Sequence, residues 1–178
     1  MPSRHVVFVG PMGSGKSTVG SRVAVALGRT FLDNDDLLAS AAGMSAAELE
    51  RRDGIDAVHR VEASVLLDAL ARDVPAVIAA AASTIEVAAV RAALTDRAWV
   101  GWLRAGHDTL ASRLPGSPTR PLGQVDPSTL VTEQSRRRDP LFADVADASF
   151  ETDGSDVDTV VADVVKKVVA ASGEGPLS

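Results

Sequence analysis

The sequence has few of the residues that disulfides, metal clusters and membrane segments require. It has no cysteine and only three histidines among 178 residues. This excludes a disulfide framework and a thiolate nucleophile, and leaves little for a histidine-based metal site. No apolar run reaches the roughly 18 residues of a membrane-spanning helix, and the first residues have no signal-peptide profile. We therefore expect a cytoplasmic protein without a membrane partner.

Positive charge is also scarce. The 18 Lys and Arg residues are outnumbered by 24 Asp and Glu residues, which gives a net charge of −6 and disfavours nucleic-acid binding. With 46% hydrophobic residues the chain has enough apolar material for one packed core. We expect one domain over residues 1–172, a frayed tail at 173–178, a monomer, and a small-molecule ligand.

Short apolar runs alternate with helical patterns along the chain. Runs of β-branched and other apolar residues predict strands at 5–9, 30–32, 76–80, 98–103 and 148–150. Helical spacing predicts helices from Lys16 to a C-cap at Gly28 and around 46–50, 56–70, 85–94, 107–113 and 156–171. Such alternation implies right-handed crossovers between parallel strands. We predict an α/β fold with a parallel sheet of about five strands and helices on both faces.

The most specific local motif is a glycine-rich loop that fits G-x-x-x-x-G-K-[ST]. Its residues are Gly10, Pro11, Met12, Gly13, Ser14, Gly15, Lys16 and Ser17. The loop follows a predicted strand and opens a predicted helix, which is the context that a phosphate-binding loop requires. Lys16 is expected to contact the β- and γ-phosphates of ATP and Ser17 to ligate Mg²⁺, with Thr18 supporting the turn. A glycine-rich turn that only caps a helix is the alternative.

An acidic pair follows the second predicted strand. Asp33 and Asp35 form a D-x-D pattern at the carboxyl end of this strand, where ligands of open α/β sheets bind. Phosphoryl transfer needs one group that holds a cation and another that orients or deprotonates the nucleophile. The alternative is an acidic helix N-cap, and Asp36 is expected to begin a helix.

Together with several later segments, these motifs resemble the shikimate kinases, small P-loop kinases related to nucleoside monophosphate kinases. The segments are, in order, Asp53-Gly54, residues 59–62 (HRVE), Arg113, Arg120-Pro121-Leu122 and residues 137–142 (RRDPLF). The resemblance covers nearly the whole chain. It implies a three-layer P-loop fold, a substrate-binding helical region at 34–62 and a mobile lid at 114–123.

The resemblance also implies roles for individual residues. Asp33 would hold Mg²⁺ through water, together with Ser17. Asp35 would bind substrate hydroxyls beside the attacking oxygen, and would act in catalysis with Lys16 and Arg120. The nucleotide contacts would come from Gly10, Gly13, Ser14, Gly15, Lys16, Ser17, Thr18 and Arg113.

Arginines complete the site that the resemblance implies. Arg113 and Arg120 would close over the nucleotide and the transferring phosphate. Arg138 matches the arginine that binds the substrate carboxylate, a role that suits the bidentate guanidinium group. Its neighbours Arg136 and Arg137 are expected to lie on a solvated helical face.

Two features of the sequence depart from the family pattern. The family has an arginine where this chain has His59, and Glu62 lies on the same helical face, where it favours a protonated imidazole. A surface histidine paired with Glu62 is the alternative. Ala81, Ala82 and Ser83 replace family glycines, and their Cβ atoms restrict positive φ and fill space beside the substrate. We expect these four residues to shape the acceptor pocket.

The leading hypothesis is an ATP-dependent kinase that phosphorylates a hydroxyl of a small polyhydroxylated carboxylate, with shikimate as the first candidate. Three alternatives remain: a gluconate-like sugar-acid kinase, an inert nucleotide-binding regulatory module, and a P-loop kinase of nucleotides. The last would use Arg120 and Arg138 to bind a second phosphate. The intact Lys16, Ser17 and Asp35 favour an active enzyme, because phosphoryl transfer depends on such residues.

Overall fold

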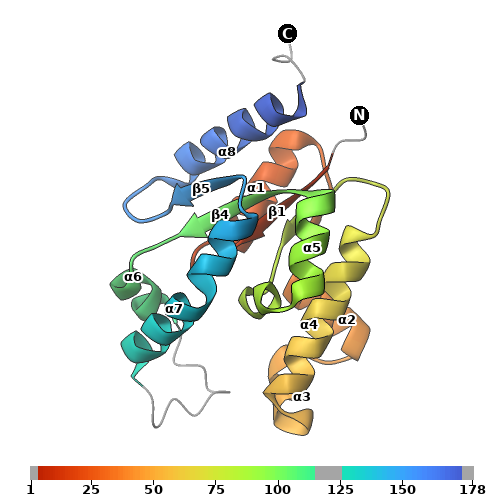
Figure 1. Cartoon of the computed structure of the whole chain (residues 1–178), viewed down its shortest axis with the longest axis vertical. Coiled ribbons are helices and arrows are strands. Elements are labelled where there is room, and N and C mark those ends of the chain that lie inside the picture. The colour runs from red at the N-terminus through yellow and green to blue at the C-terminus, as the bar shows by residue number, and fades with distance from the viewer. Residues whose placement is uncertain (1–3, 115–125, 174–178) are drawn as a thin grey trace.

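The computed structural model describes residues 4–114 and 126–173. Its sheet has five parallel strands in the order β2-β3-β1-β4-β5 (Figure 1). The strands are β1 His5–Val9, β2 Phe31–Asp33, β3 Val77–Ala79, β4 Ala98–Arg104 and β5 Ala148–Glu151. The predicted α/β class and the five-stranded parallel sheet are therefore confirmed.

Helices cover both faces of this sheet (Figure 1). They are α1 Lys16–Leu27, α2 Asn34–Ala42, α3 Ala46–Asp53, α4 Ile55–Leu70, the 3-10 turn η1 Ala82–Glu86, α5 Ala88–Arg97, α6 His107–Arg113, α7 Pro127–Val145 and α8 Val157–Ser172. Side chains of α1 and α8 fill the core on one face, and those of α4, α5 and α7 fill the core on the other. Among the described residues, no helix combines the length and hydrophobicity needed to cross a bilayer.

Strand β1 shows why the sheet is buried on both faces. Val6 and Phe8 enter the core beneath α1 and α8, whereas Val7 and Val9 enter the core beneath α4, α5 and α7. Successive side chains of a strand point to opposite faces, so a continuous apolar run suits a strand between two helical layers.

A third, smaller core lies under the helical region 34–62. Leu38 of α2, Leu49 of α3, and Ala57 and Val58 of α4 form it. This core holds α2 and α3 against the start of α4, close to the carboxyl ends of β2 and β3. The region predicted to bind the substrate is therefore a compact helical unit.

Several predicted boundaries differ from the structure. The second strand lies one residue later than predicted, and α2 begins at Asn34 rather than at Asp36 because Asp33 caps it. The predicted helix at 85–94 is divided into η1 and α5. A helical face was expected at Arg136 and Arg137, but the extent of α7 was not predicted, because its residues are mostly polar and include Pro140.

Candidate functional site

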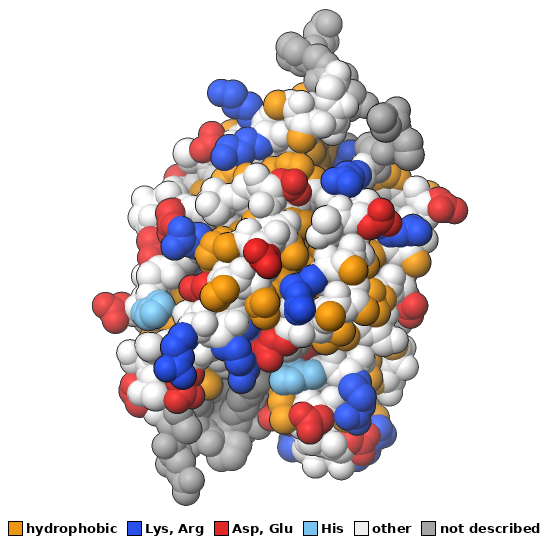
Figure 2. All heavy atoms as spheres, viewed as in Figure 1, with side chains coloured by type: hydrophobic (Ala, Val, Ile, Leu, Met, Phe, Trp, Pro, Cys, Tyr) orange, Lys and Arg blue, Asp and Glu red, His pale blue; other side chains and the backbone are white. Residues whose placement is uncertain are grey.

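One cavity of about 800 Å³ collects residues from segments far apart in the sequence. Its walls come from the loop before α1 and the start of α1, the β2–α2 junction, α3, α4, the segment after β3, α6, α7 and residues 152–160. It lies at the carboxyl ends of the strands, where open α/β sheets bind their ligands. On the face seen in Figure 2, acidic and basic side chains are interspersed rather than gathered into patches of one sign.

The glycine-rich loop has the geometry of an anion site. A Cβ atom at Gly10, which has φ 141°, would overlap the carbonyl oxygen of Leu103. Gly13 and Gly15 have φ of 82° and 93°, a region that favours glycine. Gly15 caps α1 without a side-chain hydrogen bond, and the buried Ser14 hydroxyl has no partner among the described residues. The loop and helix terminus thus offer unsatisfied donors to phosphate oxygens.

Lys16 lies at the base of this loop. Its Nζ donates hydrogen bonds to the carbonyl oxygens of Gly10 at 2.9 Å and Pro11 at 2.8 Å. Burial lowers the Lys16 pKa to about 8, although the negative charges of Asp35 and Asp33 oppose this shift. A bound phosphate would favour the charged form of Lys16 and strengthen the interaction.

Asp33 serves both as a helix cap and as part of the site. Its Oδ1 accepts a hydrogen bond from the backbone N–H of Asp35 at 3.0 Å, which caps α2. Its Oδ2 accepts a hydrogen bond from the Ser17 hydroxyl at 2.5 Å. The helix-cap alternative for Asp33 is therefore confirmed, and its metal role stays a prediction.

The Ser17 and Asp33 oxygens are suited to Mg²⁺. Mg²⁺ prefers oxygen ligands and is usually held by few protein groups, with phosphates and water completing its octahedron. Among residues 4–114 and 126–173, no group of three or more His, Cys, Asp and Glu residues is arranged to hold a metal ion alone. The structure thus fits a metal that binds together with a phosphate ligand.

Asp35 lines the cavity near the phosphate loop. Partial burial raises its pKa, the charge of Asp33 adds to this effect, and Lys16 opposes it. A raised pKa makes the carboxylate a better proton acceptor. The neighbouring Asn34 was not predicted as a site residue. It is 1% exposed and lines the cavity, and its side-chain amide donates a hydrogen bond to the backbone oxygen of Glu62 at 3.4 Å. The only sequence signal for Asn34 was its position between two aspartates.

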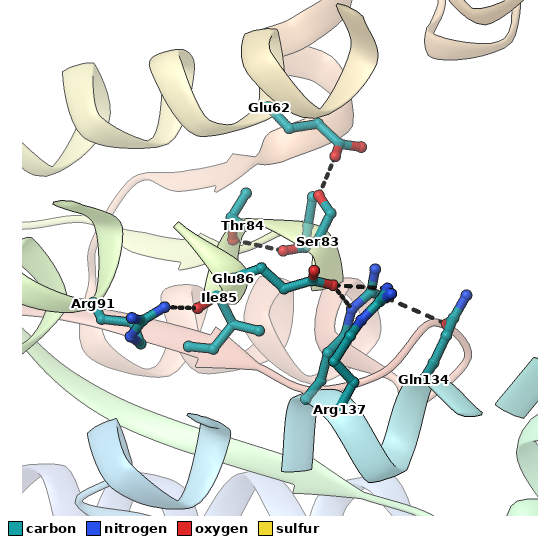
Figure 3. A network of polar contacts seen from close by, with 10 residues as sticks. Glu62, Ser83, Thr84, Ile85, Glu86, Arg91, Gln134 and Arg137 are labelled. Atoms are coloured by element: carbon teal, nitrogen blue, oxygen red, sulfur yellow. Dashed lines mark hydrogen bonds and ion pairs between the residues drawn. The ribbon is translucent and has the colours of Figure 1, made fainter. Parts of the chain in front are cut away.

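His59 and Glu62 of α4 both line the cavity. Within the described part of the chain, no ion pair joins them, so the alternative of a surface histidine paired with Glu62 is wrong as a direct contact. Glu62 instead accepts a hydrogen bond from the Ser83 hydroxyl (Figure 3). Burial raises the Glu62 pKa, although the hydrogen bond from Ser83 and the charge of His59 act in the opposite direction.

The segment that replaces the family glycines has ordinary backbone geometry. Ala81, Ala82 and Ser83 line the cavity, and Ala81 has φ −65° and ψ 140°. No described residue other than glycine has a positive φ. These side chains therefore change the space in the cavity without straining the backbone.

Helix α7 contributes Arg137 and Arg138 to the wall of the cavity. The Arg138 side chain is only 8% exposed, and its Nε donates to Glu86 Oε1 at 2.5 Å. Its Nη1 donates to Gln134 at 3.3 Å. Arg137 Nη2 lies 3.0 Å from the same Glu86 oxygen (Figure 3). Arg137 was expected on a solvated face beside Arg136. It is 61% exposed but also lines the cavity, so that expectation is wrong in part.

Arg113 lies at the end of α6, next to the phosphate loop. Its Nη1 donates to the carbonyl oxygen of Gly13 at 3.0 Å, and its side chain lines the cavity. Thr152 and Ser155 line the cavity as well. Arg120 and nearly all of the expected lid at 114–123 lie outside the described residues.

The fold and this cavity together define the chain as a P-loop kinase of small molecules, because a phosphate-type loop shares one cavity with carboxylate and guanidinium side chains. A family model described as shikimate kinase matches residues 12–169. The chain therefore belongs to the shikimate kinase family, as the resemblance in its sequence implied.

Individual relatives agree with this assignment. A shikimate kinase from Francisella tularensis subsp. novicida (strain U112) is 30% identical over 160 residues, covering 89% of this chain and 91% of the relative. The structure of shikimate kinase from Acinetobacter baumannii in complex with shikimate has a TM-score of 0.86 and 28% identity, covering 94% of each chain. A gluconokinase from Sinorhizobium meliloti 1021 shares the fold, with a TM-score of 0.66 and 19% identity over 97% of this chain and 96% of the other.

Proposed function

We propose that this chain transfers the γ-phosphoryl group of ATP to a hydroxyl group of shikimate, with Mg²⁺ as cofactor. One observation supports this function above the others. A single cavity joins the phosphate-binding loop to Asp35, which suits a hydroxyl group, and to the buried Arg138, which suits a carboxylate. Family membership points to the same reaction. We also propose that residues 1–172 act as one domain and that the chain is a monomer.

The phosphate end of the cavity would bind and orient the nucleotide. Backbone N–H groups of the loop and the Lys16 ammonium would contact phosphate oxygens, and Arg113 would approach from α6. Ser17 and Asp33 would hold Mg²⁺, which when bound neutralises charge on the phosphates. The phosphate loop keeps its shape through its positive-φ glycines, so these donors are arranged before the ligand arrives.

The acceptor end would hold a hydroxylated acid. Asp35 would accept a hydrogen bond from the attacking hydroxyl and take its proton as the new oxygen–phosphorus bond forms and the bond from the γ-phosphorus to the departing ADP breaks. Arg138 would bind the carboxylate. His59, Ala81, Ala82 and Ser83 would form the remaining wall, so they determine how closely the acceptor must fit.

A coupled ADP-release assay tests this proposal. The acceptors to compare are shikimate, quinate, gluconate, aminoshikimate and nucleoside monophosphates, each with ATP and Mg²⁺. We expect shikimate to have the highest kcat/KM. A protein carrying Asp35→Asn, purified in the same way, controls for contaminating kinases and should lose about 100-fold or more in kcat. Acceptor-independent ADP release, or a higher kcat/KM with gluconate or a nucleotide, would overturn the proposal.

A further inference from the structure

Two consecutive arginines share one carboxylate oxygen at the acceptor end of the cavity. Arg138 Nε and Arg137 Nη2 lie 2.5 Å and 3.0 Å from Glu86 Oε1. Successive side chains on an α-helix point in directions about 100° apart, so a shared contact requires a third group to draw them together. Figure 3 shows Glu86 reaching from the segment after β3 toward α7 to provide this contact.

The two arginines are held differently. Arg138 is buried and also bonded to Gln134, whereas Arg137 is 61% exposed and has Glu86 as its described ion-pair partner. Partial burial alone would raise the Glu86 pKa, but the hydrogen bonds and charges of Arg138 and Arg137 lower it below its usual range. Glu86 therefore stays ionised and can hold both guanidinium groups.

The balance of charge shows why Arg137 matters. Glu86 and Arg138 together are formally neutral, so Arg138 alone would attract a second carboxylate only weakly. Adding Arg137 leaves one net positive charge at this wall of the cavity. Asp35 and Glu62, which line the same cavity, make that positive charge more important for an anionic acceptor.

We propose that Arg137 and Arg138, gathered by Glu86, bind the acceptor carboxylate together. Arg137 then supplies a second positive charge beside Arg138, on the same wall of the cavity. A guanidinium group is charged at every physiological pH, whereas an imidazole is not. Glu86 acts as a positioning residue that sets the distance between the two guanidinium groups. The inference rests on the proposed function, because it assigns residues to the acceptor of that reaction.

Arg137→Gln and Arg136→Gln form a matched pair of variants. Both remove one positive charge from the same turn of α7, but only Arg137 lines the cavity. We expect Arg137→Gln to raise KM for shikimate about tenfold, the effect of losing one charged hydrogen bond, and to change KM for ATP and kcat less than about twofold. Arg136→Gln should leave all three unchanged. Calorimetry should show the same loss of shikimate affinity.

The methyl ester of shikimate separates charge recognition from general damage. It lacks the acceptor's negative charge, so wild type and Arg137→Gln should have similar kcat/KM values with it. A loss of equal size with shikimate and with the ester would overturn the assignment of Arg137. Equal effects of Arg137→Gln and Arg136→Gln would overturn it as well.

A double-mutant cycle tests the role of Glu86. Glu86→Ala should raise KM for shikimate several-fold in the wild-type background and much less in the Arg137→Gln background, because both changes disturb one contact. Glu86→Asp should restore part of the affinity. A lower KM in Glu86→Ala would show that Glu86 competes with the acceptor, and would overturn the positioning role.

These outcomes are separable from failure of the proposed function. Wild-type turnover decides which acceptor is used, and the variants are then compared with that acceptor. If the wild type prefers gluconate, the proposed function fails while the arginine pair is still tested with gluconate and a neutral polyol. If the preferred acceptor carries no anionic group, the arginine pair loses its ligand and this inference fails too.

Discussion

Lys16 lies half-buried against the carbonyl groups of Gly10 and Pro11, and this position has opposite effects on function and stability. Burial lowers its pKa from 10.5 to about 8, so the folded chain binds this proton more weakly than the unfolded chain does. Keeping Lys16 charged in the folded chain therefore lowers the free energy of unfolding at neutral pH. This cost disappears as pH rises from about 8 past 10.5.

Lys16→Met should separate the two effects. At pH 7 the variant should gain about 1 kcal/mol, or about 2–4 °C in Tm, and this gain should vanish near the alkaline end of the titration. Its turnover should fall by orders of magnitude, because the charge that follows the transferring phosphate is lost. Thermal denaturation and ADP release measure the two quantities. Retained turnover in the folded variant would exclude Lys16 from catalysis, and a lower Tm at pH 7 would contradict the stability argument.

Ser83 and Glu62 give a second prediction, which concerns pH. Burial raises the Glu62 pKa, and the hydrogen bond from Ser83 partly offsets this. Ser83→Ala should raise the Glu62 pKa further, so Glu62 becomes protonated at a higher pH as the solution is acidified. Any change in the kcat/KM profile for shikimate that follows the Glu62 titration should move to higher pH, with little change at pH 8. Coincident profiles of the two proteins would show that Glu62 ionisation does not affect catalysis.

At the scale of secondary structure, the junction between β2 and α2 combines a helix cap with the proposed Mg²⁺ site. Asp33 caps α2 through one carboxylate oxygen and contacts Ser17 through the other. Both asparagine and aspartate are good N-cap residues, whereas alanine is not. Two substitutions at this one position can therefore distinguish the two roles.

Asp33→Asn should keep the helix cap and lose the negative charge. We expect its free energy of unfolding to stay within about 0.5 kcal/mol of wild type, while Asp33→Ala loses about 1 kcal/mol. Both variants should need more Mg²⁺ for half-maximal activity. Denaturant unfolding and a Mg²⁺ titration of turnover measure these effects. An unchanged Mg²⁺ requirement in both variants would show that Asp33 caps the helix but does not hold the metal.

How well an element could be predicted depended on how local its signals are. Some signals lie within a few neighbouring residues of the sequence. They are the glycine-rich loop, the Gly28 cap and the valine stripe of α8, and the structure contains all three. The extent of helix α7 was missed because its exposed face is polar and Pro140 interrupts the pattern. Glu86 and Arg138 are 52 positions apart, so only tertiary packing reveals their contact.

At the scale of the whole molecule, the three cores differ in size. The cores on the two faces of the sheet are large, whereas four buried residues form the core under region 34–62. Local stability follows the amount of buried apolar contact. Region 34–62, which is proposed to bind the substrate, should therefore open more easily than the sheet.

Hydrogen exchange can test this difference. Amides of α3 should exchange faster than those of β1, and shikimate should slow α3 because Ala46 and Glu50 of this helix line the cavity. Leu49→Ala should speed exchange in α3 more than in β1, because it removes contacts of the small core. Equal exchange in α3 and β1 would mean that the chain opens only as one unit.

The most direct test of the central claim is the mass and amount of the product. The wild-type chain would be incubated with ATP, Mg²⁺ and shikimate, and the products quantified by mass spectrometry. The account predicts shikimate carrying one added phosphate, formed in equal amount to ADP, and neither product above background with Asp35→Asn. ADP without phosphorylated shikimate would mean that water or another acceptor takes the phosphate, and would contradict the account.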